Sequence, residues 1–127
     1  MRVLIHEEIG KDIKKCSRKK WYIGIENELP GIIKLLQAKG GMPGETPFHY
    51  VSIELQGKTF HASISLPKCG FGKMKGPRII YHIDKNESII RILYIGGHKD
   101  KVYNDSRLIV RVLNSRFLSG AFYSPSP

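Results

Sequence analysis

The spacing of apolar residues predicts a strand and two helices in the first third of the chain. Residues 2–6 form a short apolar run that is typical of a strand. Ile9, Ile13 and Cys16 then fall on one face of a helix, with acidic residues near its start and lysines near its end. A second helical pattern covers residues 22–39 and ends at two consecutive glycines.

The period of the pattern changes to two after a loop over residues 40–47 that is rich in glycine and proline. The alternation predicts four strands, over residues 49–55, 59–66, 78–83 and 88–95. The last two form a hairpin across a polar turn, and residues 104–118 return to a helical spacing. This order predicts an α+β fold. We expect two N-terminal helices on one face of a mainly antiparallel sheet of three to five strands, and a short C-terminal helix.

The length of 127 residues fits a single domain with one core. We place that domain at residues 1–118 and interpret residues 119–127, which have little to fix them, as a flexible tail. Hydrophobic residues make up 41% and charged residues 25%, a composition that excludes a wholly disordered protein. Because no signal peptide and no membrane-spanning apolar run is visible, we expect a cytoplasmic protein with no membrane partner.

The charge balance is strongly positive. Lys and Arg number 21 against 11 Asp and Glu, which gives a net charge of +10 and favours polyanionic partners, nucleic acid first. Residues 55–83 contain no acid. The candidate nucleic-acid contacts in this stretch are Lys58, Lys68, Lys73 and Lys75, together with Phe71, which could stack on a base. The alternative, a solvated loop whose lysines only keep the protein soluble, stays open.

A second group of chemically active residues follows the last predicted strand. His98, Lys99, Lys101 and Tyr103 come directly after two glycines, at a strand end where side chains can converge on one site. Histidine, lysine and tyrosine can transfer protons or contact phosphate. The alternative is an exposed polar loop with Tyr103 packed beneath it.

The cysteines and histidines do not form a metal-binding pattern. Cys16 and Cys69 lie far apart and make neither a CxxC pair nor a zinc motif. We expect both thiols to be reduced, with a disulfide as the alternative. His49, His61 and His82 fall on predicted strands, and we interpret each as a partnered strand histidine rather than a ligand. Walker, HExxH and EF-hand motifs are absent from the sequence, which therefore predicts no metal and no cofactor.

Two blocks around the hairpin carry a resemblance to a known family. They are Lys75-Gly-Pro-Arg-Ile-Ile-Tyr-His-Ile-Asp84 and Ile89-Ile-Arg-Ile-Leu-Tyr-Ile-Gly-Gly-His-Lys-Asp-Lys-Val-Tyr103. They resemble the RelE/ParE superfamily of toxin–antitoxin toxins: an arginine opens an apolar strand, an acidic turn and a second apolar strand follow, and a basic cluster precedes Val-Tyr. Leu55-Gln-Gly-Lys-Thr-Phe60 is similar to the turn that the family has before its second strand. The resemblance covers most of residues 2–113.

The RelE branch of this family implies a ribosome-dependent mRNA endoribonuclease that uses no metal. The reaction is attack of a 2′-OH on the neighbouring phosphate. The resemblance places Arg78 on the scissile phosphate, His98 or Lys99 at the cationic position, and Tyr103 in base stacking or proton transfer. The implied partners are mRNA, the ribosome and a cognate antitoxin protein with an acidic segment.

Two other functions remain as alternatives. The ParE branch inhibits DNA gyrase and has no nuclease site, and a third possibility is a basic nucleic-acid-binding module without catalysis. The sequence departs from the family in the strand over residues 60–66, where Ser63 and Ser65 stand in place of a charge.

Overall fold

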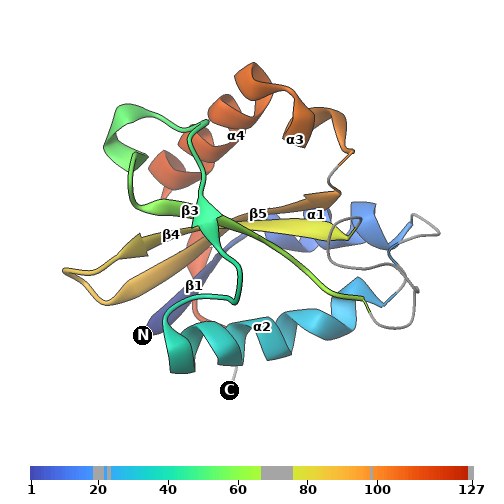
Figure 1. Cartoon of the computed structure of the whole chain (residues 1–127), viewed down its shortest axis with the longest axis horizontal. Coiled ribbons are helices and arrows are strands. Elements are labelled where there is room, and N and C mark those ends of the chain that lie inside the picture. Colours follow the sequence, from blue (N-terminus) through green and yellow to red (C-terminus); the bar gives the residue numbers. More distant parts are fainter. Residues whose placement is uncertain (19–21, 23, 67–75, 98, 126–127) are drawn as a thin grey trace.

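The computed structural model describes residues 1–18, 22, 24–66, 76–97 and 99–125. A central sheet carries helices on both faces (Figure 1). In chain order the elements are β1 (Arg2–His6), α1 (Ile9–Ser17), α2 (Ile25–Lys39), β2 (Thr46–Pro47), the 3-10 helix η2 (Ile53–Leu55), β3 (Thr59–Ser63), β4 (Pro77–Asp84), β5 (Ile89–Gly97), α3 (Lys101–Asn104), α4 (Ser106–Ser119) and β6 (Phe122–Tyr123).

The six strands lie in the order β2-β3-β4-β5-β1-β6. β1 runs parallel to β5, and the other neighbouring strands pair antiparallel. The α+β class, the mainly antiparallel sheet and the β4–β5 hairpin are therefore confirmed. In the β3–β4 ladder His61 lies opposite Ile80, and Ser63 lies opposite Arg78. Directly opposed residues share a face, so this register puts His61 and Arg78 on the same side of the sheet.

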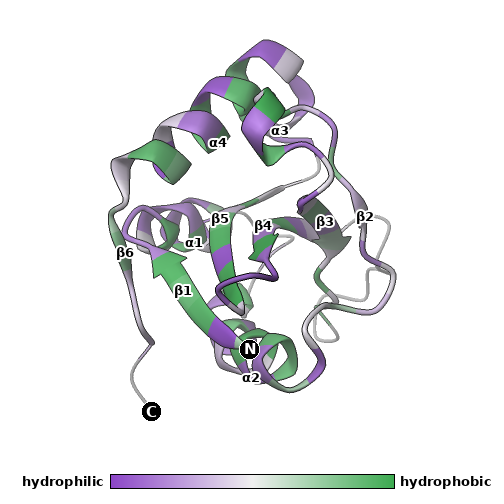
Figure 2. Cartoon of the chain, turned by 90° about the vertical axis from the view of Figure 1, so that its left-hand side faces the viewer, coloured by the Kyte–Doolittle hydropathy of each residue, from purple (hydrophilic) through white to green (hydrophobic). Residues whose placement is uncertain are grey.

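Each face of the sheet carries its own apolar core. α1 and α2 cover one face, where Ile9 and Ile25 pack with the inward side chains of β1, β4 and β5. α4 covers the other face, where Ile109 and Leu113 pack on Leu93. In Figure 2 β1 is apolar along most of its length, whereas hydrophilic and hydrophobic positions alternate along α4. That alternation lets α4 bury one side and expose the other.

Several sequence-based expectations are corrected by this architecture. The sheet has six strands rather than three to five, because β2 and β6 add a two-residue edge strand on each side. The C-terminal helix α4 is not short, with 14 residues, and the helices cover both faces. Residues 49–55 do not form a strand: the Gln56 amide donates to the carbonyls of His49 and Val51 and stabilises a turn that leads into η2.

The segment that follows α4 forms β6, the outer strand at one edge of the sheet. β6 pairs with β1, and the Glu7 N–H donates to the Ala121 carbonyl at 2.9 Å. The His6 ring and the Ser119 hydroxyl are hydrogen-bonded at 3.0 Å. The sequence suggests that residues 119–127 are a flexible tail. In the part of this segment that the structure describes, Phe122–Tyr123 form a strand. Among the described helices none is long and apolar enough to cross a membrane.

A largely buried ion pair joins α4 to α1. Arg116 of α4 forms two hydrogen bonds to the carboxylate of Asp12 on α1, at 2.6 and 2.9 Å. The same guanidinium donates to the Leu93 carbonyl, and the Asp12 carboxylate accepts the Ile95 N–H. One ion pair therefore links α1, β5 and α4. It holds α4 on the face of the sheet that carries Arg78 and His61.

Candidate active site

The face of the sheet beneath α3 and α4 brings together three polar side chains from three elements. His61 stands on β3, Arg78 on β4 and Tyr103 on α3. Nδ1 of His61 and the hydroxyl of Tyr103 are hydrogen-bonded at 2.8 Å. The Arg78 guanidinium lies close enough to the same Tyr103 hydroxyl to affect its pKa, and it donates to the Gly76 carbonyl at 2.7 Å. The hydrogen-bonded pair of His61 and Tyr103, together with the neighbouring Arg78, is called here the His–Arg–Tyr group.

The loop after β5 sets the position of Tyr103. The buried Asp100 carboxylate accepts the Gly97 N–H at 2.8 Å, which closes a tight turn directly before α3. A side chain at Gly97 would meet the Tyr22 ring at 2.8 Å, so only glycine fits this approach. On the other side of α3, the Asp105 carboxylate caps α4 by accepting the N–H groups of Arg107 and Leu108. Two aspartates thus fix both ends of the short helix that carries the tyrosine.

The electrostatics of the group favour a neutral histidine beside a protonated phenol. Burial lowers the pKa of His61, and the positive charge of Arg78 lowers it further, so the imidazole is uncharged at neutral pH. Burial raises the pKa of Tyr103, against the opposing effect of Arg78, so the phenol keeps its proton. The site therefore offers a proton acceptor, a proton donor and a permanent cation in direct contact.

A pocket of about 400 Å³ opens beside this group. One wall is the segment Pro47–Tyr50, and the rest is His61, Tyr103, Asn104 and Ser106. The Phe48 ring contacts the His61 ring edge-on, with 5.1 Å between centroids, and holds the Tyr50 ring at 5.7 Å. Phe48 is buried and Tyr50 is exposed. The histidine–tyrosine pair therefore opens onto an aromatic pocket.

The structure brings together two of the residues that the sequence identified, Arg78 and Tyr103. Lys99 and Lys101 lie exposed at the turn before α3 and at its start. Lys58 is exposed at the opposite end of β3, where it lines a different pocket with Asp84 and other residues of the β4–β5 turn. The remaining candidates lie outside the described residues: Lys68, Phe71, Lys73, Lys75 and His98.

Sequence reasoning missed His61, which it interpreted as a strand histidine with a structural partner. The partner is Tyr103, 42 residues away. The alternation of the strand could have indicated which way His61 faces. Its neighbour Ala62 is apolar and packs in the α1–α2 core, so His61 faces away from that core. Pairing it with Arg78, however, needs the β3–β4 register. The sequence did not predict the aromatic wall of the pocket, because Tyr50 lies in a segment expected to form a strand and Phe48 lies directly before it.

Comparison with known proteins gives a likeness at the level of structure. No family model matches the chain, and no curated protein matches it. A solved structure of an arginine-to-alanine double mutant of the Escherichia coli toxin RelE in the free state is similar, with a TM-score of 0.48 and 9% sequence identity. The match covers 78% of this chain and 86% of that one. Within the described ranges, no group of three or more His, Cys, Asp or Glu side chains could hold a metal ion.

Proposed function

We propose that this chain is the toxin of a type II toxin–antitoxin pair and acts as an endoribonuclease on mRNA. The observation that carries the proposal is the His–Arg–Tyr group, in which a neutral imidazole is hydrogen-bonded to a protonated phenol beside a guanidinium, on one face of the sheet. The resemblance of residues 75–103 to the RelE branch adds the expectation that the mRNA is cleaved on the ribosome.

The proposed reaction is an internal transesterification of RNA. The 2′-oxygen forms a bond to the adjacent phosphorus while the bond from phosphorus to the 5′-oxygen breaks, which leaves a 2′,3′-cyclic phosphate and a 5′-OH. One proton leaves the 2′-OH and one reaches the 5′-oxygen, so no external reactant is needed. Negative charge grows on the non-bridging phosphate oxygens in the transition state. Arg78 stabilises that charge through its planar, permanently charged fork.

His61 and Tyr103 fit the two proton transfers. His61 is neutral because its pKa is lowered, so it can accept the 2′-OH proton. Tyr103 holds its proton because its pKa is raised, so it can donate to the leaving 5′-oxygen. Their 2.8 Å hydrogen bond then returns a proton from the histidinium to the tyrosinate and restores both groups. A metal has no role in this sequence, so we expect cleavage to continue in EDTA.

The net charge of +10 supports polyanionic partners for the rest of the surface. We propose that mRNA and ribosomal RNA bind it during cleavage, and that a cognate antitoxin neutralises it with an acidic segment. The exposed Lys99 and Lys101 beside α3 are the nearest described candidates for phosphate contacts. Such contacts make binding strongly dependent on salt.

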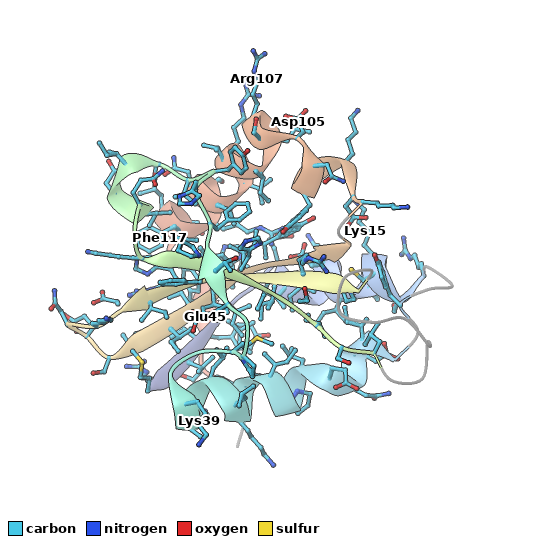
Figure 3. All side chains as sticks on the ribbon, viewed as in Figure 1. Lys15, Lys39, Glu45, Asp105, Arg107 and Phe117 are labelled. Atoms are coloured by element: carbon cyan, nitrogen blue, oxygen red, sulfur yellow. The ribbon has the colours of Figure 1, made fainter. Side chains whose placement is uncertain are left out.

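The test is mRNA cleavage on programmed ribosomes, with free RNA measured in parallel and EDTA present. We expect products that end in a 2′,3′-cyclic phosphate. Arg78→Ala, His61→Ala and Tyr103→Phe should each lower the rate by 10²-fold or more, in the range of lost general acid–base or electrostatic catalysis. Arg107→Ala is the matched control, because that arginine extends from α4 away from the sheet (Figure 3). Circular dichroism of each variant confirms folding.

Two results would overturn the proposal. If the wild-type protein leaves both ribosome-bound and free RNA intact, the chain is not a nuclease. If it leaves RNA intact but stops DNA supercoiling by gyrase, the alternative toxin branch is correct. Growth arrest that survives the Arg78→Ala substitution would also separate toxicity from the His–Arg–Tyr group.

A further inference from the structure

We propose that the pocket beside the His–Arg–Tyr group binds a nucleobase and sets the base preference at the cleavage site. This inference rests on the proposed function and adds to it a specificity determinant that the chain itself supplies. The pocket is lined by Phe48, His49, Tyr50 and Asn104, together with the catalytic pair of His61 and Tyr103. Its volume of about 400 Å³ lies at the lower end of the range of small-molecule sites, which suits one planar heterocycle.

The aromatic wall is suited to stacking. Tyr50 is 55% exposed, and its ring meets the buried Phe48 ring edge-on, at an interplanar angle of 73°. An edge-on contact covers at most one of the two flat faces of the tyrosine ring, so at least one face is not covered by Phe48. Bases of unpaired RNA stack on such exposed aromatic faces. Tyr50 therefore supplies a stacking surface next to the residues that would cut the chain.

The wall is held in place rather than free to collapse. The Phe48 N–H donates to the Thr59 carbonyl at 2.9 Å, and Pro47 pairs with Phe60 in the β2–β3 ladder. The amide of Gln56 donates to the backbone carbonyl of His49 at 2.9 Å and braces the chain just before Tyr50. A braced wall lowers the entropy that a ligand loses when it orders the site.

The rim supplies groups that can read a base edge. Asn104 follows Tyr103 directly and is exposed, and its amide carries both a donor and an acceptor. Asparagine can form a bidentate pair with the edge of a base, which distinguishes one base from another. His49 and Ser106 add two further hydrogen-bonding groups. Stacking on Tyr50 would thus give affinity, and Asn104 would give selectivity.

The location relates the pocket to the scissile bond. His61 and Tyr103 belong both to the pocket and to the His–Arg–Tyr group, so a base in the pocket lies within one nucleotide of the phosphate on Arg78. A base held there would orient its own ribose, and with it the 2′-OH, toward the histidine. Aromatic side chains of a protein partner could also enter such a pocket, and the experiment separates the two occupants.

The first measurement does not depend on cleavage. The four nucleoside 3′-monophosphates are titrated into the full chain and followed by backbone amide NMR. We expect saturable shifts at Tyr50 and Asn104, with affinities that differ between the four bases. Tyr50→Ala should weaken binding roughly 5- to 100-fold, the range of one stacked base, whereas Tyr50→Phe should retain it. Tyr123→Ala is the control, because Tyr123 is similarly exposed but lies on β6.

The second measurement uses four RNAs that differ only in the base at the cleavage site. The wild-type chain should prefer one base, and Asn104→Ala should reduce that preference at least five-fold while RNA is still cut. If cleavage proceeds with an unchanged preference in both Tyr50→Ala and Asn104→Ala, the pocket is not the base site, although the proposed function stands. If nucleotides bind with these signatures but no RNA is cut, the nuclease function fails and the pocket remains. If no nucleotide shifts these residues and only an antitoxin peptide does, the inference is wrong.

Discussion

Removing the carboxylate of Asp12 should destabilise the fold more than any surface substitution. The Asp12 side chain is 12% exposed and that of its partner Arg116 is 16% exposed, so both charges lie largely out of water. The carboxylate accepts two bonds from the guanidinium and one from the Ile95 N–H. Among the described residues, Asp12→Ala therefore leaves a largely buried cation with the Leu93 carbonyl and the Tyr94 ring as partners.

The magnitude follows from those contacts. Breaking a buried ion pair from one side costs about 3–5 kcal/mol, because the remaining charge stays desolvated and unpaired. That cost includes the unsatisfied Ile95 N–H, since such a group alone costs about 1–3 kcal/mol. Domains of this size are stable by about 5–15 kcal/mol, so Asp12→Ala should remove roughly a third to a half of the total. The expected fall in melting temperature is about 10–20 °C.

The assay is urea unfolding followed by far-ultraviolet circular dichroism, as a double-mutant cycle with Arg116→Ala. The double variant should be more stable than the sum of the two single losses predicts, by about 2 kcal/mol or more, because it leaves no lone charge. Lys11→Ala is the control: its pair with Glu8 is exposed and should contribute about 0.5 kcal/mol or less. A loss below about 1 kcal/mol for Asp12→Ala, or additive losses within about 0.5 kcal/mol, would refute the argument.

Three further predictions concern the same face of the sheet and its pH dependence. Gly97→Ala places a methyl group against Tyr22, which should lower the free energy of unfolding by about 1–3 kcal/mol and slow RNA cleavage. Gly10→Ala is the control, because the space around Gly10 is open and the fold should keep its stability. Thermal melts and cleavage rates check both variants. Burial and the charge of Arg91 lower the pKa of His82 from 6.5 to about 4, so stability should be complete above pH 6.5 and fall by about 2–3 kcal/mol as pH drops toward 4. The midpoint of urea unfolding should change less with pH over that range in His82→Gln than in the wild-type protein. Because His61 must be neutral to accept a proton, cleavage should fall only below pH 6.5, and a loss that begins above pH 7 would contradict its role.

The elements that local pattern alone determines were predicted from the sequence. β1 covers the predicted residues 2–6, and the ends of β4 and β5 lie within one or two residues of the predicted strands. The apolar runs of β4 and β5 are nearly continuous because the side chains of both faces are buried. The edge strands β2 and β6 have two residues each, too few for any periodicity to show. Their pairing depends on the neighbouring strand.

The strand predicted over residues 49–55 is wrong for a different physical reason. The sequence alternates apolar Val51, Ile53 and Leu55 with polar residues, but Val51 and Leu55 are buried beneath α4 whereas Ile53 is exposed. Over so few residues, a turn followed by a 3-10 helix can carry the same apolar alternation as a strand. The choice between them is made by the side chain of Gln56, whose two hydrogen bonds to the backbone close the turn. A polar side chain bonding to its own loop is not visible in a hydrophobic pattern.

The candidate site was predictable only in the part that one continuous block of sequence carries. Arg78 and Tyr103 belong to the block that resembles the RelE branch, and the structure places them in contact. His61 enters from β3, and its partnership with Tyr103 requires both the β3–β4 register and the turn at Gly97 that directs α3 back over the sheet. A contact made by three elements follows from tertiary structure rather than from any local spacing.

Under the proposed function, the positive charge and the His–Arg–Tyr group would have different roles in the recognition of RNA. Lysines that contact phosphate attract DNA and RNA alike, because both carry the same backbone charge. In the proposed reaction the histidine–tyrosine pair would act only on a strand that supplies a 2′-OH, so it would distinguish RNA from DNA by chemistry rather than by affinity. Substituting exposed lysines such as Lys101 should therefore weaken binding of both nucleic acids and reduce its salt dependence. Substituting His61 should leave binding intact and abolish cleavage, and that separation of effects distinguishes a surface that holds RNA from a site that cuts it.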